Sequence, residues 1–290
     1  MKHSRLARAQ SRFVWLSLTP IVLYLAVFVL FPLVSAVYDS LRDFFYEEFV
    51  GLLNYQEALF EDPRVPGAFL NTLMYAAIRI PPTIILGFFA ALALNKIIFA
   101  RGPLIFGYFA PYITSMVAYA AVFIYLFSST GLLNVILNAL GLPAQSFTRD
   151  THGALPSLAL MDALKHIGFD VLIFMAALQN IPSSVYEAAR VDGATPWQTT
   201  WNITIPLVAP TALFLVVVLT IWTVQVFEPI YVMTHGGPLG NTESIVYLIW
   251  DAAFQNNRIG YASAISILLF VLLIVISLIQ IRVGRSRWEY

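Results

Sequence analysis

The chain has 290 residues, of which 59% are hydrophobic and only 11% are charged, and its formal net charge is zero. A soluble domain carries roughly 25% charged residues, so this chain cannot cover itself with a solvated surface and is predicted to cross a membrane several times. The sequence contains no cysteine and only four scattered histidines, which excludes disulfides and thiol catalysis and argues against a metal site built from either residue.

Six apolar segments are long enough to cross a hydrocarbon core, which needs about 20 residues in a helix. The fold class is therefore predicted to be an all-α membrane protein with six transmembrane helices. The first segment is longer than the apolar run of a signal peptide, so we interpret it as an uncleaved signal anchor. The spans are expected near residues 13–38, 69–95, 104–127, 154–178, 207–233 and 261–283.

Basic residues indicate how these spans are oriented. If six spans alternate, one side of the membrane receives the N-terminus 1–12, Lys96, Arg190 and the C-terminus 284–290, whereas the other side receives mostly acidic residues. Lys and Arg are enriched in the cytoplasmic loops of membrane proteins. Both termini and the fourth link, residues 182–206, are therefore predicted to be cytoplasmic.

The external links are too short to form a separate domain. Between Gly131 and Gly141, apolar residues recur at helical spacing, and Gly141 together with Pro143 is a helix stop signal. The pattern is compatible both with an amphipathic helix on the outer membrane interface and with a helix that only fills packing space.

A polar island interrupts the apolar sequence between the fourth and fifth spans. Ser184 is expected to cap a short helix, with Glu187 as its partner in a capping box. Gly193 suits the left-handed residue that ends this helix, and Thr195 with Gln198 is expected to cap a second one. An ordinary connecting loop would need neither helix, so the island is interpreted as a docking element in which Ala188 and Ala189 form one thin face.

Charged residues inside the spans are the candidates for a solute path. Ionisable groups at membrane depth cost roughly 2.5–3.5 kcal/mol on insertion scales, so they usually face a wet cavity or each other. In the fourth span, Asp162, Lys165 and His166 share one helical face, and Asp170 lies one turn further along. Arg79 lies in the second span beside two prolines, where backbone carbonyls can be freed.

The fifth span carries Trp222, Gln225 and Glu228, each three residues from the next. On one continuous helix these residues form a stripe, because three residues are close to a full turn. A carboxylate and an amide accept hydrogen bonds from sugar hydroxyls, and an aromatic ring packs on the face of a sugar. We therefore interpret this stripe as a solute contact.

The alternative for the whole set is internal pairing, for example of Lys165 with Asp162 or with Glu228, which would hold the bundle together without touching solute. We expect Asp170 and Arg79 to be structural. Both interpretations stay open for the remaining residues of the fourth span.

Several motifs occur in an order and spacing that resemble a known family. Residues 168–169, 178–182, 186–189, 192–194 and 203–206 resemble the signature region of binding-protein-dependent ABC importer permeases of the carbohydrate-uptake group, the maltose and glycerol-3-phosphate type. Residues 71–72, 131–134, 231–238 and 260–264 fit the same pattern, so the resemblance covers nearly the whole chain. The ATPase-coupling residues that it implies are Tyr186, Glu187, Ala188, Ala189, Asp192, Gly193 and Ala194.

The resemblance implies a type I ABC importer permease fold whose cytoplasmic coupling helix sits in a cleft of an ATPase. It implies a bacterial inner-membrane complex in which this first-type permease, surrounded by lipid, joins a second homologous permease, two copies of an ABC ATPase and an external solute-binding protein. The sequence contains no Gly-x-x-x-x-Gly-Lys-Ser/Thr motif. The chain is therefore expected to be no enzyme and to hold no cofactor, with Mg-ATP bound by the partner ATPase, and no nucleic-acid partner is expected.

The residues also favour one class of solute. A phosphorylated solute such as glycerol-3-phosphate would need convergent Arg and Lys side chains, whereas Asp162, Asp170 and Glu228 make the predicted path acidic on balance. We expect a neutral sugar or a glycosylated polyol, with a glycerol-3-phosphate permease as the alternative. A secondary transporter is a further alternative, but such proteins tend to contain inverted repeats and broken helices, and the sequence shows no convincing internal repeat.

Overall fold

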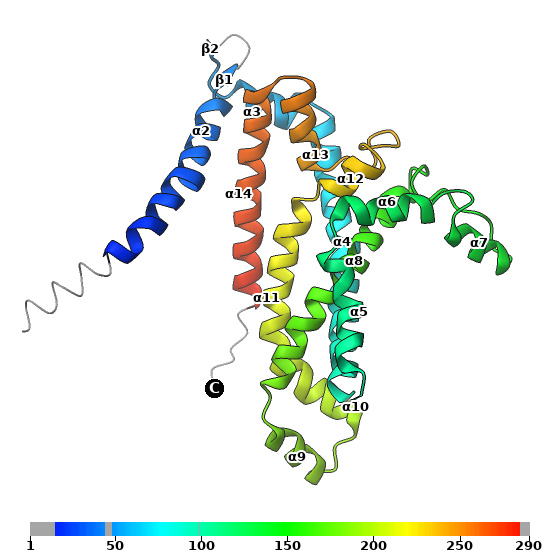
Figure 1. Cartoon of the computed structure of the whole chain (residues 1–290). Coiled ribbons are helices and arrows are strands. Elements are labelled where there is room, and N and C mark those ends of the chain that lie inside the picture. Colours follow the sequence, from blue (N-terminus) through cyan, green and yellow to red (C-terminus); the bar gives the residue numbers. More distant parts are fainter. Residues whose placement is uncertain (1–14, 44–47, 98, 285–290) are drawn as a thin grey trace, which may run out of the picture. The chain divides into compact units, whose positions relative to one another are not determined.

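The computed structural model describes residues 15–43, 48–97 and 99–284, and most of them are helical (Figure 1). Two units make up the chain, one formed by Met1–Asp62 with Ile249–Leu269 and the other by Pro63–Leu248 with Phe270–Tyr290. The predicted cytoplasmic termini, apart from Gly284, lie outside the described residues.

The first described helix of the first unit, Trp15–Ser40, has 26 residues and is long and apolar enough to cross a membrane. This helix includes the π-helical turn η1 (Ala26–Leu30) and ends as α2 (Phe31–Ser40). The other elements of the first unit are the antiparallel strands β1 (Arg42–Asp43) and β2 (Glu48–Phe49), α3 (Leu53–Gln56), η2 (Glu57–Glu61), η4 (Asp251–Gln255) and the first part of α14 (Ile259–Gly284).

Polar contacts hold the start of α14 within this unit. The Arg258 guanidinium donates a hydrogen bond of 2.8 Å to Glu57, and this bond raises the pKa of Arg258 above its ordinary value. The Tyr261 hydroxyl donates to Asp62 over 2.7 Å. Gly260 lies so close to the chain after α2 that a Cβ there would come within 2.0 Å of the Arg42 carbonyl oxygen. The beginning of α14 is therefore fixed by an ion pair, a hydrogen bond and a close backbone approach.

The second unit contains most of the helices. Its elements are α4 (Arg64–Lys96), α5 (Arg101–Ile113), α6 (Met116–Leu126), α7 (Leu132–Ala139), α8 (Ala154–Gln179), α9 (Ser183–Val191), α10 (Pro196–Thr199), η3 (Thr200–Thr204), α11 (Ile205–Val224), α12 (Glu228–Met233), most of α13 (Ile245–Trp250) and the end of α14. The short helix predicted between Gly131 and Gly141 is present as α7.

The central pair of this unit is α4 with α8, which run parallel. The Tyr75 hydroxyl bonds the Leu158 carbonyl oxygen, and these residues are 83 positions apart in the sequence. The same separation recurs one turn later, where Arg79 pairs with Asp162. A constant sequence separation between contacting residues of two helices means that the two helices run in the same direction. Two spans separated by one intervening span must run this way if the spans alternate across a membrane.

Helix α5 packs against α8 at a glycine. A Cβ on Gly168 would lie 2.1 Å from the carbonyl oxygen of Tyr108, so only glycine allows the two backbones this close. The apolar core beside this contact includes Phe88 and Phe174, whose rings meet edge to face with centroids 5.5 Å apart. Tight packing therefore holds both α4 and α5 against α8.

The segment predicted as one third span, residues 104–127, is broken in the structure. Helix α5 ends at Ile113, and α6 starts at Met116 in a direction bent by 97° from α5. Thr114 and Ser115 between them have non-helical backbone, with ψ angles of 141° and 137°. A continuous apolar run did not reveal this bend, because composition does not report which backbone carbonyls have partners elsewhere in the fold.

The segment predicted as the fifth span, residues 207–233, is also broken. Helix α11 ends at Val224, and α12 begins at Glu228. Pro229 accounts for the position of the break, because a proline lacks the N–H that would bond the carbonyl four residues earlier and its ring clashes with that carbonyl. Four residues before Pro229 is Gln225, where the helix stops. Trp222 and Glu228 therefore do not share one helix, and the predicted single-helix stripe is wrong.

Four described helices can cross a membrane by length and composition, and the bent pair α5–α6 makes a fifth if it is one span. Helix α8 has 26 residues but carries Asp162, Lys165 and Asp170 in its middle, so composition does not assign it to a membrane. The number of six spans stays a prediction. The four helices are Trp15–Ser40, Arg64–Lys96, Pro196–Val224 and Ile259–Gly284.

Candidate functional site

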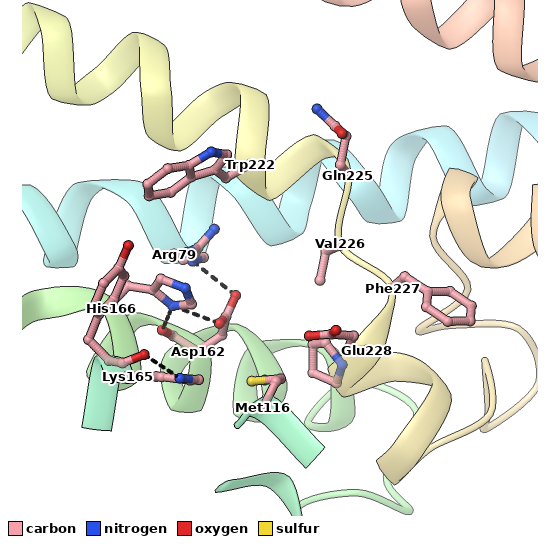
Figure 2. A pocket seen from close by; sticks show the side chains of 12 residues that line it. Arg79, Met116, Asp162, Lys165, His166, Trp222, Gln225, Val226, Phe227 and Glu228 are labelled. Atoms are coloured by element: carbon pink, nitrogen blue, oxygen red, sulfur yellow. Dashed lines mark hydrogen bonds and ion pairs between the residues drawn. The ribbon is translucent and has the colours of Figure 1, made fainter. Parts of the chain in front are cut away.

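A cavity of about 610 Å³ lies in the second unit where the two broken segments meet α4 and α8 (Figure 2). Its wall contains all six residues predicted for the solute path, which are Asp162, Lys165, His166, Trp222, Gln225 and Glu228. Arg79, which we expected to be structural, also lines it. The structure therefore brings together residues from two separate predicted spans, although their contact with solute stays a prediction.

One wall of the cavity is a buried ionic network around Asp162. Its Oδ2 is 2.9 Å from Arg79 Nε and accepts a hydrogen bond of 3.1 Å from the Tyr75 hydroxyl, and its Oδ1 is 3.0 Å from His166 Nδ1. Arg79 also donates to the Thr223 hydroxyl. Arg79 and Asp162 are at most 4% exposed, so the network replaces water as their partner.

Lys165 is on the same wall but is satisfied in a different way. Its Nζ donates to the carbonyl oxygens of Pro111, Tyr112 and Thr114 over 2.8, 3.0 and 2.6 Å. An ammonium group has three hydrogens, so all of them are in use. Partners other than Asp162 and Glu228 therefore satisfy this ammonium, in contrast to the pairing that we gave as an example.

The opposite wall is formed by the end of α11, the segment 225–227 and the start of α12. Trp222 is 41% exposed and packs on Phe169 with ring centroids 5.3 Å apart. Glu228 is exposed, and its carboxylate makes no hydrogen bond or ion pair with any residue that the structure describes. This wall therefore offers polar and aromatic surface that the protein itself does not occupy.

Gln225 differs from its two neighbours on this wall. Its Nε2 donates back to the Ile221 carbonyl oxygen over 3.0 Å. Figure 2 shows the Gln225 amide directed away from the Asp162 network. Gln225 thus borders the cavity with less of its polar surface available than Glu228.

The sequence did not identify several cavity residues, because they come from the broken segments. Tyr112 and Met116 flank the bend of the third predicted span, and Val226 and Phe227 lie in the break of the fifth. Proline was the available signal, since Pro111 and Pro229 both lie inside predicted spans.

Asp170 is fully buried but is not part of this cavity. Neither carboxylate oxygen has a hydrogen-bond partner among the described residues, and its Cβ faces Gly87 on α4. No cluster of three or more His, Asp or Glu side chains in the described ranges could hold a metal ion.

The polar island forms two short helices, as its sequence predicts. Helix α9 ends in a Schellman motif, in which the Ala194 N–H bonds Ala189 O over 2.9 Å and the Gly193 N–H bonds Arg190 O over 3.1 Å. Gly193 has φ of +75°. Thr195 and Gln198 form the expected capping box at the start of α10.

One cap in this loop was predicted wrongly. Helix α9 begins at Ser183 after Pro182, and no side chain caps it, so Ser184 lies inside the first turn and forms no box with Glu187. The two alanines also lie on different faces, because Ala189 is buried while Ala188 is exposed. A thin face made of both alanines therefore does not form.

The outward surface of the loop is partly apolar, since Val191 and Trp197 are 87% and 65% exposed. Tyr186, Glu187, Arg190 and Ala194 also line a cleft of about 450 Å³ between the loop and the end of α4. Figure 1 shows α9 at one end of the second unit and α7 projecting from its side, away from α9. The loop thus presents a shaped, exposed surface away from α7.

A model of the family of binding-protein-dependent transport system inner membrane components matches residues 58–288. The trehalose/maltose transport system permease protein MalF of Thermococcus litoralis is 32% identical over 98% of this chain and 97% of its own. The lactose transport system permease protein LacF of Rhizobium radiobacter is 30% identical over 94% of both chains.

Solved structures give the same result for the fold. A chain of a bacterial ABC transporter involved in the import of the acidic polysaccharide alginate superposes with a TM-score of 0.86 at 25% identity, over 98% of this chain and 100% of its own. A chain of the bacterial alginate transporter in complex with an alginate pentasaccharide-bound periplasmic protein gives a TM-score of 0.84 at 25% identity, over 96% and 95%. The resemblance inferred from the sequence motifs is therefore confirmed.

Proposed function

Because the chain belongs to the family of binding-protein-dependent transport system inner membrane components, we propose that it is a permease subunit of an ATP-driven importer for a neutral sugar or a glycosylated polyol. Relatives named for trehalose and maltose and for lactose transport support the carbohydrate class. A multi-pass protein of this family would reside in the bacterial inner membrane.

The observation that carries the proposal is the cavity between the two broken segments. Non-helical backbone at membrane depth is tolerated only where it is buried in protein or lines a water-filled space. The segment 225–227 lines this cavity, as do Tyr112 and Met116 on either side of the break at 114–115. Charged residues from α4, α8 and α12 line it as well. A wet passage for a polar solute explains both features at once.

The distribution of charge favours a neutral solute. The two buried cations of the cavity, Arg79 and Lys165, are already engaged by Asp162 and by backbone carbonyls. Glu228 is the charged group that remains open to a ligand on the opposite wall. A carboxylate accepts hydrogen bonds from sugar hydroxyls, whereas it repels a phosphate. A glycerol-3-phosphate permease is therefore the weaker alternative.

We assign coupling to the link 182–206, with both termini and this link in the cytoplasm. The loop surface that carries Glu187, Val191 and Asp192 would dock on one of two ATPase copies, which bind and hydrolyse Mg-ATP. A second homologous permease would complete the passage, and an external binding protein would deliver the solute. The parallel run of α4 and α8 supports six alternating spans with α5–α6 as a single broken one.

Reconstitution tests the coupling directly. Proteoliposomes that contain both permeases and the ATPase are supplied with the loaded binding protein, and solute uptake and ATP hydrolysis are measured together. Gly193→Val should abolish uptake, since Gly193 has φ of +75° and a Cβ is unfavourable there. Gly141→Val is the matched control, because Gly141 has φ of +73°, also faces open space and lies in the outer link.

The two outcomes of this comparison are distinct. Equal loss in both variants would mean that backbone strain alone removes activity, and normal uptake by Gly193→Val would exclude the docking role. Uptake without ATP would instead support a secondary transporter, which also contains broken helices.

The membrane orientation of the chain is tested with single introduced cysteines, which are unique because the chain has none. Gly193→Cys should react only from the cytoplasm and Phe60→Cys only from outside.

A further inference from the structure

The bend between α5 and α6 exposes backbone carbonyls that need partners. The last carbonyl groups of any α-helix have no partner within that helix. Here the Thr114 hydroxyl donates a hydrogen bond to the Ala110 carbonyl oxygen over 2.9 Å, and the Thr114 N–H donates one to the Pro111 carbonyl oxygen over 3.3 Å. Two further carbonyls, those of Tyr112 and Thr114, receive hydrogen bonds from a side chain of another helix.

That side chain is Lys165 of α8. Its ammonium donates to three carbonyl oxygens around the bend, all within 3.0 Å, and it is 4% exposed. Hydrogen bonds from an ionised donor are stronger than neutral ones, and a cation is favourable at a helix C-terminus. The ring centroid of Tyr119 on α6 lies 5.7 Å from the same ammonium. One charged group therefore contacts both arms of the bend.

The bend in turn shapes the cavity. Tyr112 on α5 and Met116 on α6 flank it, and both line the cavity wall. Helix α6 then packs against α12, which begins at Glu228. A straight continuation of α5 would remove α6 from that position and open this side of the cavity.

We propose that Lys165 is a positioning residue that holds the bend between α5 and α6 and thereby sets which solutes the cavity accepts. The inference rests on the proposed transport function for its specificity, but the bend itself is independent of transport. Lys165 contributes no hydrogen bond of its own to the solute, because its three donors are used.

The bend is measured with spin labels on cysteines placed at Phe106 on α5 and Val122 on α6, which are 65% and 58% exposed. At 1.5 Å per residue, the helix axes at these positions are about 16 Å apart across a 97° bend and about 24 Å apart on a straight helix. Lys165→Met should broaden the distance distribution towards the longer value. Lys165→Arg should restore much of the parent distribution, because it retains a charged donor.

Specificity is measured on the reconstituted complex with a panel of mono-, di- and trisaccharides. Lys165→Met should change the ratio of KM values between small and large sugars by at least about threefold, with a smaller change in maximal rate, and Lys165→Arg should reverse part of the shift. Leu164→Met is the control, since the neighbouring Leu164 is exposed and its aliphatic side chain has no donor for the carbonyls of the bend. A merely structural role would lower the yield of complex in Lys165→Met without changing the KM ratio.

The two measurements separate the role of Lys165 from the proposed transport function. An unchanged distance distribution in Lys165→Met overturns the proposal, and so does a changed distance with unchanged KM ratios. If Lys165→Met gives no complex, Lys165→Gln is measured in its place, with the same criteria. Failure of the parent complex to transport any sugar would count against the proposed function alone, because the spin-label distances would still show whether Lys165 holds the bend.

Discussion

Each of the two walls of the cavity carries a carboxylate, but the two carboxylates differ in burial and in their partners. On the α4–α8 wall, Arg79 and Asp162 are buried and form an ion pair. On the α11–α12 wall, Trp222 and Glu228 are exposed, and Glu228 has no bonded partner among the described residues. Charge inside a membrane segment therefore does not by itself indicate a solute contact.

The difference between the walls is whether the donors and acceptors are already used. A buried charge without its partner is strongly unfavourable, so residues of the first wall hold the helices in place. An exposed group beside a cavity exchanges water for a ligand at little structural cost. We expect substitutions of Arg79 and Asp162 on the first wall to reduce assembly, and substitutions of Trp222 and Glu228 on the second to reduce transport per assembled complex.

The largest effect is expected from Arg79→Met, which leaves Asp162 buried with fewer partners. Breaking a buried pair by removing one partner costs about 3–5 kcal/mol. The variant should assemble in low yield, as measured by size-exclusion chromatography of the complex. Adding Asp162→Leu should recover yield, because replacing both charges removes the unpaired one. Normal yield of the single variant would show that this wall does not support the fold.

The next largest effect is expected from Gly168→Ala on α8. Its Cβ would lie 2.1 Å from the Tyr108 carbonyl oxygen, so α5 and α8 must move apart. Overpacking of this kind costs about 1–3 kcal/mol and should lower the thermal stability of the complex. Gly107→Ala on α5 is the matched control, since nothing lies within 4 Å of a Cβ there. Equal thermal stability of the two variants would exclude close packing as the function of Gly168.

The sequence predicted the local structure of the link 182–206 better than that of the cavity, for a physical reason. Gly193 and the Thr195–Gln198 box act on backbone groups a few residues away, so local chemistry determines them. Ser184 failed as a cap because Pro182 already occupies the position before the helix. In this loop, a single neighbouring residue was enough to change the outcome.

The cavity depends on contacts that are distant in the sequence. Lys165 donates hydrogen bonds to carbonyl oxygens more than 50 positions away in the sequence, and Arg79 on α4 forms an ion pair with Asp162 on α8. Spacing placed Asp162, Lys165 and His166 on one face correctly, but it could not show which of them the protein would satisfy internally. It also missed the break at Gln225, although Pro229 was visible in the sequence.

A moderate effect, confined to transport, is expected on the second wall. Glu228→Gln removes a charged acceptor, and a hydrogen bond to a charged group contributes about 1.5–3 kcal/mol. Uptake per assembled complex should fall about tenfold or more, and the yield should stay at the parent level. Trp222→Ala should act similarly and change the preference among sugars. Lower yield with unchanged uptake per complex would place these residues with the first wall.

The smallest effect is expected from Gln225→Ala, which tests whether position beside the cavity is sufficient. The Gln225 amide bonds its own helix at Ile221 and is directed away from the Asp162 network (Figure 2). Its loss should change uptake per complex by less than about twofold, because a hydrogen bond that the protein makes to itself contributes only about 0.5–1.5 kcal/mol to the fold and nothing to solute binding. Glu228→Gln, measured in the same assay, provides the comparison. If Gln225→Ala reduced uptake as much as Glu228→Gln, the amide would have to turn towards the solute during transport, and the open wall would extend along the whole break between α11 and α12.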